Sequence, residues 1–261
     1  MDLEPRHLDA LRKARRAYDR AAEERGTRTG LEWVTSLGLG ERDGLPGIER
    51  HRSEPNREDL FSLVADASQD TMTLCAVILA WGGMRVSHGK ALFGAGAGAV
   101  WRRAAEEVRF EDLGRADAYS RFHALRLRKV LPGMGPAYFT KLVFFLRGKD
   151  VHDVGYIMDQ WTGCSLNVLT GDPNTVLMNA TYTWKRSKKT RQVGLRSAFQ
   201  VSDENGPDRY ERFCSAVDRI AGEVSLSRMD AELLLMSRGR GRGAWRKHVL
   251  HHRQTPTIGP A

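Results

Sequence analysis

A tight turn followed by an apolar helix, at residues 130–146, constrains the fold more than any other part of this sequence. The turn reads Leu-Pro-Gly-Met-Gly (131–135), and Pro136 stands where the helix begins. Proline suits the first helical position because its missing N–H would have no partner there. The helix is almost entirely apolar apart from Lys141, which predicts that it is buried. We therefore expect a mainly α-helical protein organised around this segment.

The two glycines of the turn indicate what the segment binds. Gly133 and Gly135 let the backbone turn tightly and leave its amides facing outward. Exposed amides at the N-terminus of a helix bind phosphate without any side chain. The basic segment 119–129 can reach the same phosphates, although a basic run is more often a solvated face. The predicted DNA-binding residues of this unit are Lys129, Leu131, Pro132, Gly133, Met134 and Gly135.

Two charged residues stand in otherwise apolar surroundings. Lys141 is flanked at helical spacing by apolar and aromatic residues, and Asp159 follows eighteen residues later, directly after the apolar pair 157–158. A buried amine and a buried carboxylate beside a phosphate-binding turn suggest chemistry on DNA. A simpler interpretation makes Asp159 the N-cap of a helix expected over 160–169. The two interpretations are compatible.

These motifs resemble the helix-hairpin-helix DNA glycosylase superfamily, and within it the bacterial proteins with an 8-oxoguanine glycosylase-like fold. The shared pattern is Leu-Pro-Gly-x-Gly, a lysine on the helix after the hairpin, and an aspartate further along. The resemblance implies two helical lobes, with the hairpin and Asp159 at the cleft between them. It also implies that Lys141 attacks the sugar and that Asp159 supports the charge that develops there.

The sequence departs from the family pattern at one position. The usual lysine lies two residues past the second glycine of the hairpin, where this chain has Ala137. Lys141 is one helical turn further along, so it can point the same way from a different height. The resemblance is best over residues 70–170.

Helical patterning and the resemblance together divide the chain into five parts. We expect an N-terminal helix and loop (1–56), a helical glycosylase core (57–171), a basic β-like insert (172–206), C-terminal helices that pack on the core (207–237) and a basic Arg-Gly tail (238–261).

Two of these parts carry further expectations about DNA. In the insert, β-prone residues precede a basic run, in which Lys185, Arg186, Lys188 and Lys189 are expected to contact the DNA backbone. In the tail, Trp245 offers a flat surface on which a base can stack. A solvated loop is the alternative interpretation of the basic run.

Aromatic and polar residues near the motifs are candidates for a pocket that receives an extruded base, namely Trp81, Gln160 and Trp161. Trp81 ends an apolar helix expected over 71–81, which Asp70 caps and the pair 82–83 terminates. A core tryptophan followed by a glycine C-cap explains the same residues equally well.

Composition limits the remaining classes. The net charge of +9 favours an anionic partner. The three cysteines fit neither a disulfide framework nor a zinc or iron–sulfur spacing. His248, His251 and His252 have a spacing close to that of metal ligands, but no carboxylate or cysteine joins them, so we expect no metal. The glycine-rich stretch 94–98 lacks the strand and the acid of a dinucleotide site, so we expect no nucleotide cofactor. We expect no cofactor of any other kind either.

No apolar run approaches the length of a membrane span, and the N-terminus is charged. We expect no membrane partner and a monomeric, cytoplasmic protein that associates with the nucleoid.

The function predicted from these features is that of a DNA glycosylase, which flips a damaged or modified base out of DNA and excises it. If Lys141 reacts, a Schiff base permits AP-lyase cleavage of the strand; if it points away, water is the nucleophile. The substrate is either an oxidised purine, in repair, or a modified base in phage DNA, in antiviral defence. The alternatives are a non-catalytic helix-hairpin-helix DNA-binding protein and, from the Arg-Gly tail alone, an RNA-binding module. The acid–amine pair favours the enzyme.

Overall fold

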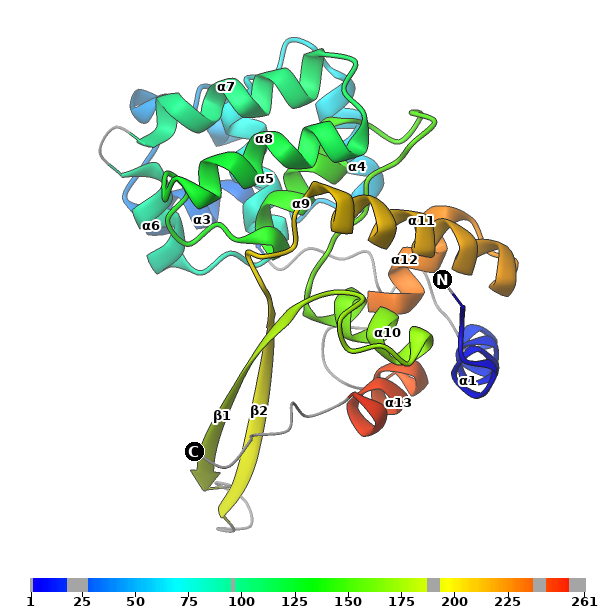
Figure 1. The fold of residues 1–261 in the computed structure, drawn as a ribbon. Helices are drawn as coiled ribbons and strands as arrows, with labels where there is room; N and C mark the ends of the chain where they lie inside the picture. Colours follow the sequence, from blue (N-terminus) through cyan, green and yellow to red (C-terminus); the bar gives the residue numbers. More distant parts are fainter. Residues whose placement is uncertain (1, 18–27, 95–96, 187–192, 237–242, 254–261) are drawn as a thin grey trace.

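The computed structural model describes residues 2–17, 28–94, 97–186, 193–236 and 243–253 (Figure 1). Within these ranges the chain forms twelve α-helices and one pair of antiparallel strands. The prediction of a mainly α-helical fold with a small β insert is therefore confirmed.

A first group of helices surrounds α5 at the top of Figure 1. Every residue of α5 is buried, because helices α3, α4, α7 and α9 pack around it. The Asp70 carboxylate caps α5 by accepting a hydrogen bond from the Thr73 amide at 2.9 Å. The group comprises α3 (Gly30–Leu37), α4 (Arg57–Ala65), α5 (Thr71–Trp81), α6 (Val86–Phe93), α7 (Ala97–Phe110), α8 (Arg115–Leu127) and α9 (Pro136–Leu146), with short 3-10 turns at Glu41–Asp43 and Ile48–Arg50.

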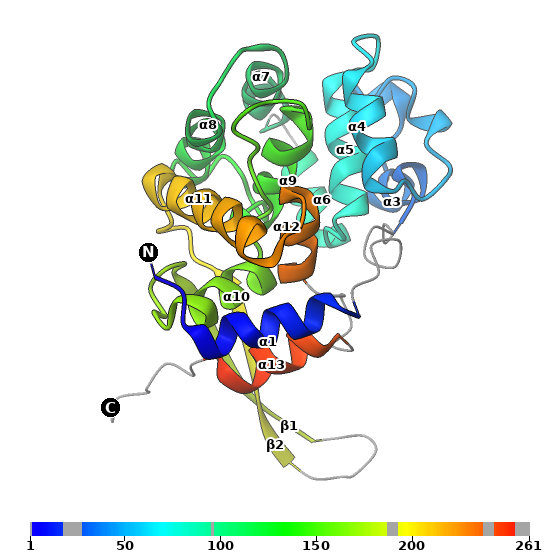
Figure 2. The ribbon, with the colours of Figure 1, turned by 90° about the vertical axis from the view of Figure 1, so that its right-hand side faces the viewer.

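A second group lies below it and combines both ends of the chain. It consists of α1 (Pro5–Arg15), α10 (Gln160–Thr170), α11 (Pro207–Val224), α12 (Arg228–Met236) and α13 (Ala244–His252). The N-terminal α1 packs on α10, α11 and α13, as Figure 2 shows, whereas α3 packs on α5 in the first group. The described helices of residues 1–56 thus lie in both groups, α1 in the second and α3 in the first. Helix α11 joins the groups by contacting both α8 and α12.

The β insert is a two-stranded hairpin that projects from the helical body (Figures 1 and 2). Strand β1 (Met178–Arg186) pairs with β2 (Val193–Val201), and Met178 stands opposite Val201. The base of the hairpin packs on α10, where a β-carbon at Gly163 would lie only 3.0 Å from the Met178 sulfur. Trp184, on β1, is 72 % exposed.

The observed helices match the sequence prediction unevenly. The helices at 71–81 and 136–146 have the bounds expected, but α6 was not predicted. The prediction of a nucleic-acid-stacking Trp245 is wrong: this residue lies on α13, is 1 % exposed, and its indole N–H donates to the Ser165 hydroxyl at 2.9 Å. Among the described residues, no helix has the length and apolar character that crossing a membrane requires.

Candidate active site

The helix-hairpin-helix turn (131–135), called the hairpin below, joins α8 to α9 and has the expected tight backbone. Gly133 has a φ of +72°, and a β-carbon there would lie 2.7 Å from the β-carbon of His88 on α6. Gly135 caps α9 in an extended conformation. Neither the Gly133 amide nor the Gly135 amide has a hydrogen-bond acceptor within the described ranges. Gly133 is half-buried, so its amide can reach an external acceptor at the positive end of α9, whereas Gly135 is itself buried.

The other predicted DNA-binding residues of the hairpin divide into exposed and buried ones. The side chains of Leu131 and Met134 are fully buried, so they anchor the turn in the core instead of facing a ligand. Pro132 is half-buried. Lys129 is exposed and forms no ion pair with any described residue. Among the predicted residues of this unit, Lys129 and the backbone at Gly133 are therefore the groups best placed to meet a phosphate.

The side chain of the basic residue Arg126 fixes the backbone of the turn by hydrogen bonds. Its guanidinium donates to the Leu131 carbonyl oxygen at 2.8 Å and to the Asp203 carboxylate at 2.9 Å. Asp203 follows strand β2, so this ion pair ties the hairpin to the β insert. Part of the basic segment predicted to face phosphate therefore has a structural role.

We expect Gly133→Ala to disrupt both the turn and DNA binding. A left-handed backbone costs an alanine about 1–2 kcal/mol, and the contact with His88 adds about 1–3 kcal/mol of overpacking. Gly148→Ala is the matched control, because Gly148 has a φ of +79° with no atom within 4 Å of an added β-carbon. Urea denaturation should show a larger loss of stability in Gly133→Ala than in Gly148→Ala. DNA titration should show a loss of affinity in Gly133→Ala and none in Gly148→Ala. Equal behaviour of the two variants would contradict this role for the turn.

Lys141 lies on α9 with its side chain buried. Its stem passes over Gly82, where a β-carbon would lie 2.8 Å from the lysine Cε, so only glycine leaves room for it. The Nζ atom donates to the Ala137 carbonyl oxygen at 2.6 Å and lies 5.2 Å from the centre of the Tyr138 ring. The side chain thus runs back along the helix and places its amine beside the residue where the family pattern has its lysine.

Burial lowers the pKa of Lys141, since it removes the ammonium form from water. The negative charges of Asp159 and Glu232 act in the opposite direction, and the positive charge of Arg57 adds to the lowering. A lowered pKa increases the fraction of lysine that carries a free electron pair at neutral pH. This is the protonation state that a nucleophilic amine requires.

Asp159 is the N-cap of α10, as one of the two interpretations predicted. Its Oδ1 atom accepts hydrogen bonds from the amides of Trp161 at 2.7 Å and Thr162 at 3.0 Å. Its own amide donates to the Thr162 hydroxyl at 2.9 Å, which completes a capping box. Oδ2 has no partner in the described part of the chain, so the fixed carboxylate keeps one oxygen for a ligand.

Thr140 links the lysine helix to the aspartate. It is fully buried next to Lys141, and its hydroxyl accepts a hydrogen bond from the Met158 amide at 3.0 Å. The same hydroxyl donates to the Pro136 carbonyl oxygen at 2.7 Å. Because Met158 directly precedes Asp159, this contact fixes the start of α10 against α9. The structure therefore brings the hairpin, Lys141 and Asp159 together.

A buried ion pair that the sequence analysis did not predict interacts electrostatically with Lys141 and Asp159. The Arg57 guanidinium donates to Glu232 Oε2 at 2.6 Å, with the side chains 2 % and 0 % exposed. Glu232 Oε1 is buried and has no hydrogen-bond partner in the described structure. Burial raises the pKa of Glu232, and the charge of Asp159 adds to the rise, whereas Arg57 opposes it. Glu232 stands alone in the apolar run 231–236, the same signal that singled out Lys141.

The predicted base-pocket residues have different environments. Trp81 is 7 % exposed and packs its ring edge on Phe145, 5.0 Å away between centres, so it belongs to the core beside the site. Trp161 is partly exposed, and the Arg246 guanidinium covers its ring at 3.5 Å. Gln160 is partly exposed too, and its amide, with N and O exchanged, bridges the Phe199 carbonyl oxygen and the Trp161 indole N–H at 2.8 Å each.

The basic residues predicted on the insert are only partly described. Lys185 and Arg186 belong to the end of β1, and their side chains are not among those described. Lys188 and Lys189 lie outside the described residues. The exposed Trp184 next to them was not among the predicted site residues.

A family model described as "Putative 8-oxoguanine DNA glycosylase OGG-like protein" matches residues 13–236 of the chain. The matched range is well over half of the 261 residues and contains the hairpin, Lys141 and Asp159. Comparisons with curated proteins and with solved structures gave no match. The chain therefore belongs to the OGG-like family within the helix-hairpin-helix DNA glycosylase superfamily.

Proposed function

We propose that this protein is a bifunctional DNA glycosylase, in which Lys141 attacks the sugar of an extruded nucleotide and Asp159 stabilises the charge that develops. The observation that carries the proposal is the Lys141 amine. It is buried, its pKa is lowered, and it lies beside the hairpin within the electrostatic reach of Asp159. A protein that only grips the DNA backbone gains nothing from this arrangement, since burying a lysine costs stability.

DNA binding is the first step of the proposed activity. The free amide of the half-buried Gly133 and the exposed Lys129 offer one phosphate site on the body of the protein. The projecting β hairpin offers a second contact, with Trp184 as an exposed aromatic surface. Contacts on both sides of the target nucleotide offset the few kcal/mol that base extrusion costs.

The chemical step requires an amine and a carboxylate on the same sugar. The Lys141 amine forms a bond to C1′ while the bond from C1′ to the base breaks, and the base leaves with the electron pair and takes up a proton from water. The free Oδ2 of Asp159 stabilises the positive charge that builds on the sugar and accepts the proton that the amine loses. Its other oxygen stays bound to the α10 amides, so the carboxylate keeps its orientation.

Strand cleavage follows from the same adduct. The C1′–O4′ bond opens, O4′ receives the proton held by Asp159, and the lysine nitrogen forms a double bond to C1′. This Schiff base acidifies the C2′ protons, so loss of one of them expels the 3′ phosphate by β-elimination.

The substrate belongs to one of two classes. The family description favours an oxidised purine, which assigns the protein to repair. A bulky modified base in phage DNA assigns it to antiviral defence. The protein's own residues near the site, Gln160 and the Trp161–Arg246 stack, offer hydrogen-bonding groups and a flat surface to either class.

A panel of duplexes tests the proposal. Substrates containing 8-oxoguanine, uracil or alkylated bases, and phage DNA with modified cytosines, are scored for abasic sites and for a protein–DNA adduct trapped by borohydride. We expect one substrate class to give both, and Lys141→Gln to lose the adduct and at least about 10²-fold in base release. Lys90→Gln, which removes an exposed lysine from α6, should behave like the wild type.

Each other outcome selects a different function. Base release without an adduct, unchanged in Lys141→Gln, would make water the nucleophile and remove the lyase step. Salt-sensitive binding to DNA with no base release from any substrate would make the protein a non-catalytic helix-hairpin-helix binder.

A further inference from the structure

Three histidines from opposite ends of the chain meet where α1 lies against α13. His7 is on α1, and His248 and His252 are one helical turn apart on α13. One nitrogen from each ring lies within 4.8 Å of the other two. His7 Nδ1 is 2.8 Å from His248 Nε2, so these two rings already share a hydrogen bond. His251, which the sequence grouped with the α13 pair, does not belong to this cluster.

The cluster has the chemistry of a transition-metal site. Imidazole nitrogen is a ligand for zinc, copper, nickel and iron, and three histidines with one open position are an established zinc arrangement. Zinc holds each imidazole nitrogen at about 2.0–2.1 Å, so the ligand nitrogens of a tetrahedral site are about 3.3 Å apart. Nitrogens separated by up to 4.8 Å must therefore move closer, while His7 Nδ1 and His248 Nε2, 2.8 Å apart, must separate slightly. Small side-chain rotations of His248 and His252 achieve this, because both rings reach the surface.

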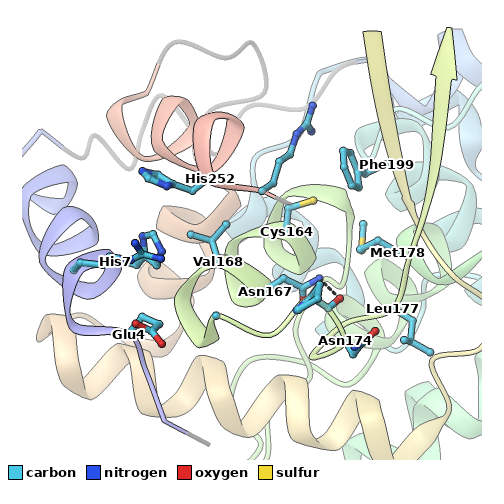
Figure 3. Close-up of a pocket in the computed structure, with 14 residues that line it drawn as sticks. Glu4, His7, Cys164, Asn167, Val168, Asn174, Leu177, Met178, Phe199 and His252 are labelled. Carbon is cyan, nitrogen blue, oxygen red and sulfur yellow. Dashed lines mark hydrogen bonds between the residues drawn. The ribbon is translucent and has the colours of Figure 1, made fainter. Parts of the chain in front are cut away.

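A cavity beside the cluster gives an ion access to solvent. Its volume is about 470 Å³, and Figure 3 shows His7 and His252 at one end of it and Met178 and Phe199 at the other. Neither Lys141 nor Asp159 lines this cavity, so it is separate from the candidate active site. Water from the cavity can occupy the coordination position that three histidines leave open.

We propose that His7, His248 and His252 bind one divalent transition-metal ion, zinc in the first instance, and that the ion clamps α1 to α13. Both helices are short, 11 and 9 residues, and helices of this length depend on tertiary contacts for their stability. The clamp joins the first described helix to the last one, across the face of α10.

The test uses the full chain, freed of metal by a chelator and then dialysed. Calorimetric titration with zinc chloride should show one ion per chain, and cobalt(II) should give the visible absorption of a tetrahedral site. Zinc at 100 times its dissociation constant should raise the melting temperature by about 5 °C or more. His7→Gln and His252→Gln should lose the ion and the temperature shift. His251→Gln, which removes an exposed imidazole from the same helix, should keep both.

The zinc site can be absent while the glycosylase activity is present, because each measurement reports zinc binding or protein stability and none reports base release. Absence of stoichiometric zinc uptake by the wild-type chain would overturn the proposal. So would uptake that persists in both His7→Gln and His252→Gln. If the buried His7 cannot be replaced without unfolding, as circular dichroism would reveal, the accessible His252 variant still decides the outcome.

Discussion

Asp159→Asn should slow base release about 10²–10³-fold while leaving the fold and DNA binding unchanged. The variant replaces a charged oxygen by a neutral group at the atom that is free to face the sugar, so the developing positive charge loses its counter-ion. Removal of one such electrostatic contact costs about 10²–10³ in rate. Asparagine is as good an N-cap as aspartate, and its side-chain oxygen can still accept the amides of Trp161 and Thr162. The loss should therefore appear in single-turnover rates and not in melting temperature.

Asp70→Asn is the matched control for this experiment. Asp70 also caps a helix, accepting from the Thr73 amide at 2.9 Å, but α5 begins away from the hairpin. We expect this variant to retain full base release. Normal activity of Asp159→Asn on a substrate that the wild type processes would leave Asp159 with a capping role alone.

Local signals in the sequence predicted much of the fold and the centre of the site. The bounds of α5 and α9 follow from Asp70, from Pro136 and from the apolar runs behind them. Lys141 and Asp159 were recognisable because each is a lone charge in an apolar context. The turn glycine Gly133 was recognisable for its backbone, but the second reason for a glycine there, the close approach of His88, lies on α6, a helix that the sequence did not reveal.

Contacts between distant segments could not be predicted in the same way. Glu232 is separated from Arg57 by 175 positions, and no spacing rule connects them. His7 and His248 are 241 positions apart, so the α13 histidines lacked a third ligand in the sequence. Trp245 looked like an exposed stacking residue because the Arg-Gly run precedes it, whereas α13 buries it against Ser165. In each case tertiary packing, and not local composition, determines the environment.

Arg57→Met should destabilise the protein severely, by about 3–5 kcal/mol at neutral pH. The change leaves the fully buried Glu232 without the guanidinium 2.6 Å away and adjacent to the charge of Asp159. It also removes the guanidinium from the rings of Phe144 and Trp81, at 5.0 and 5.6 Å. Arg57→Met with Glu232→Met should recover most of the loss, because a buried ion pair replaced as a whole by apolar residues is often neutral or better.

The pH dependence of this loss separates charge from packing. Burial already raises the pKa of Glu232 above 4.5, and removal of Arg57, the largest opposing influence, raises it further. An acid with a raised pKa in the folded state takes up a proton on folding, so its unfavourable charge appears only as the pH rises through that folded value. Urea denaturation of Arg57→Met should therefore show a larger loss at pH 8 than at pH 5, while the double variant shows none of this difference. Equal losses at both pH values would mean that packing around Phe144 and Trp81, and not the charge of Glu232, is what Arg57 supports.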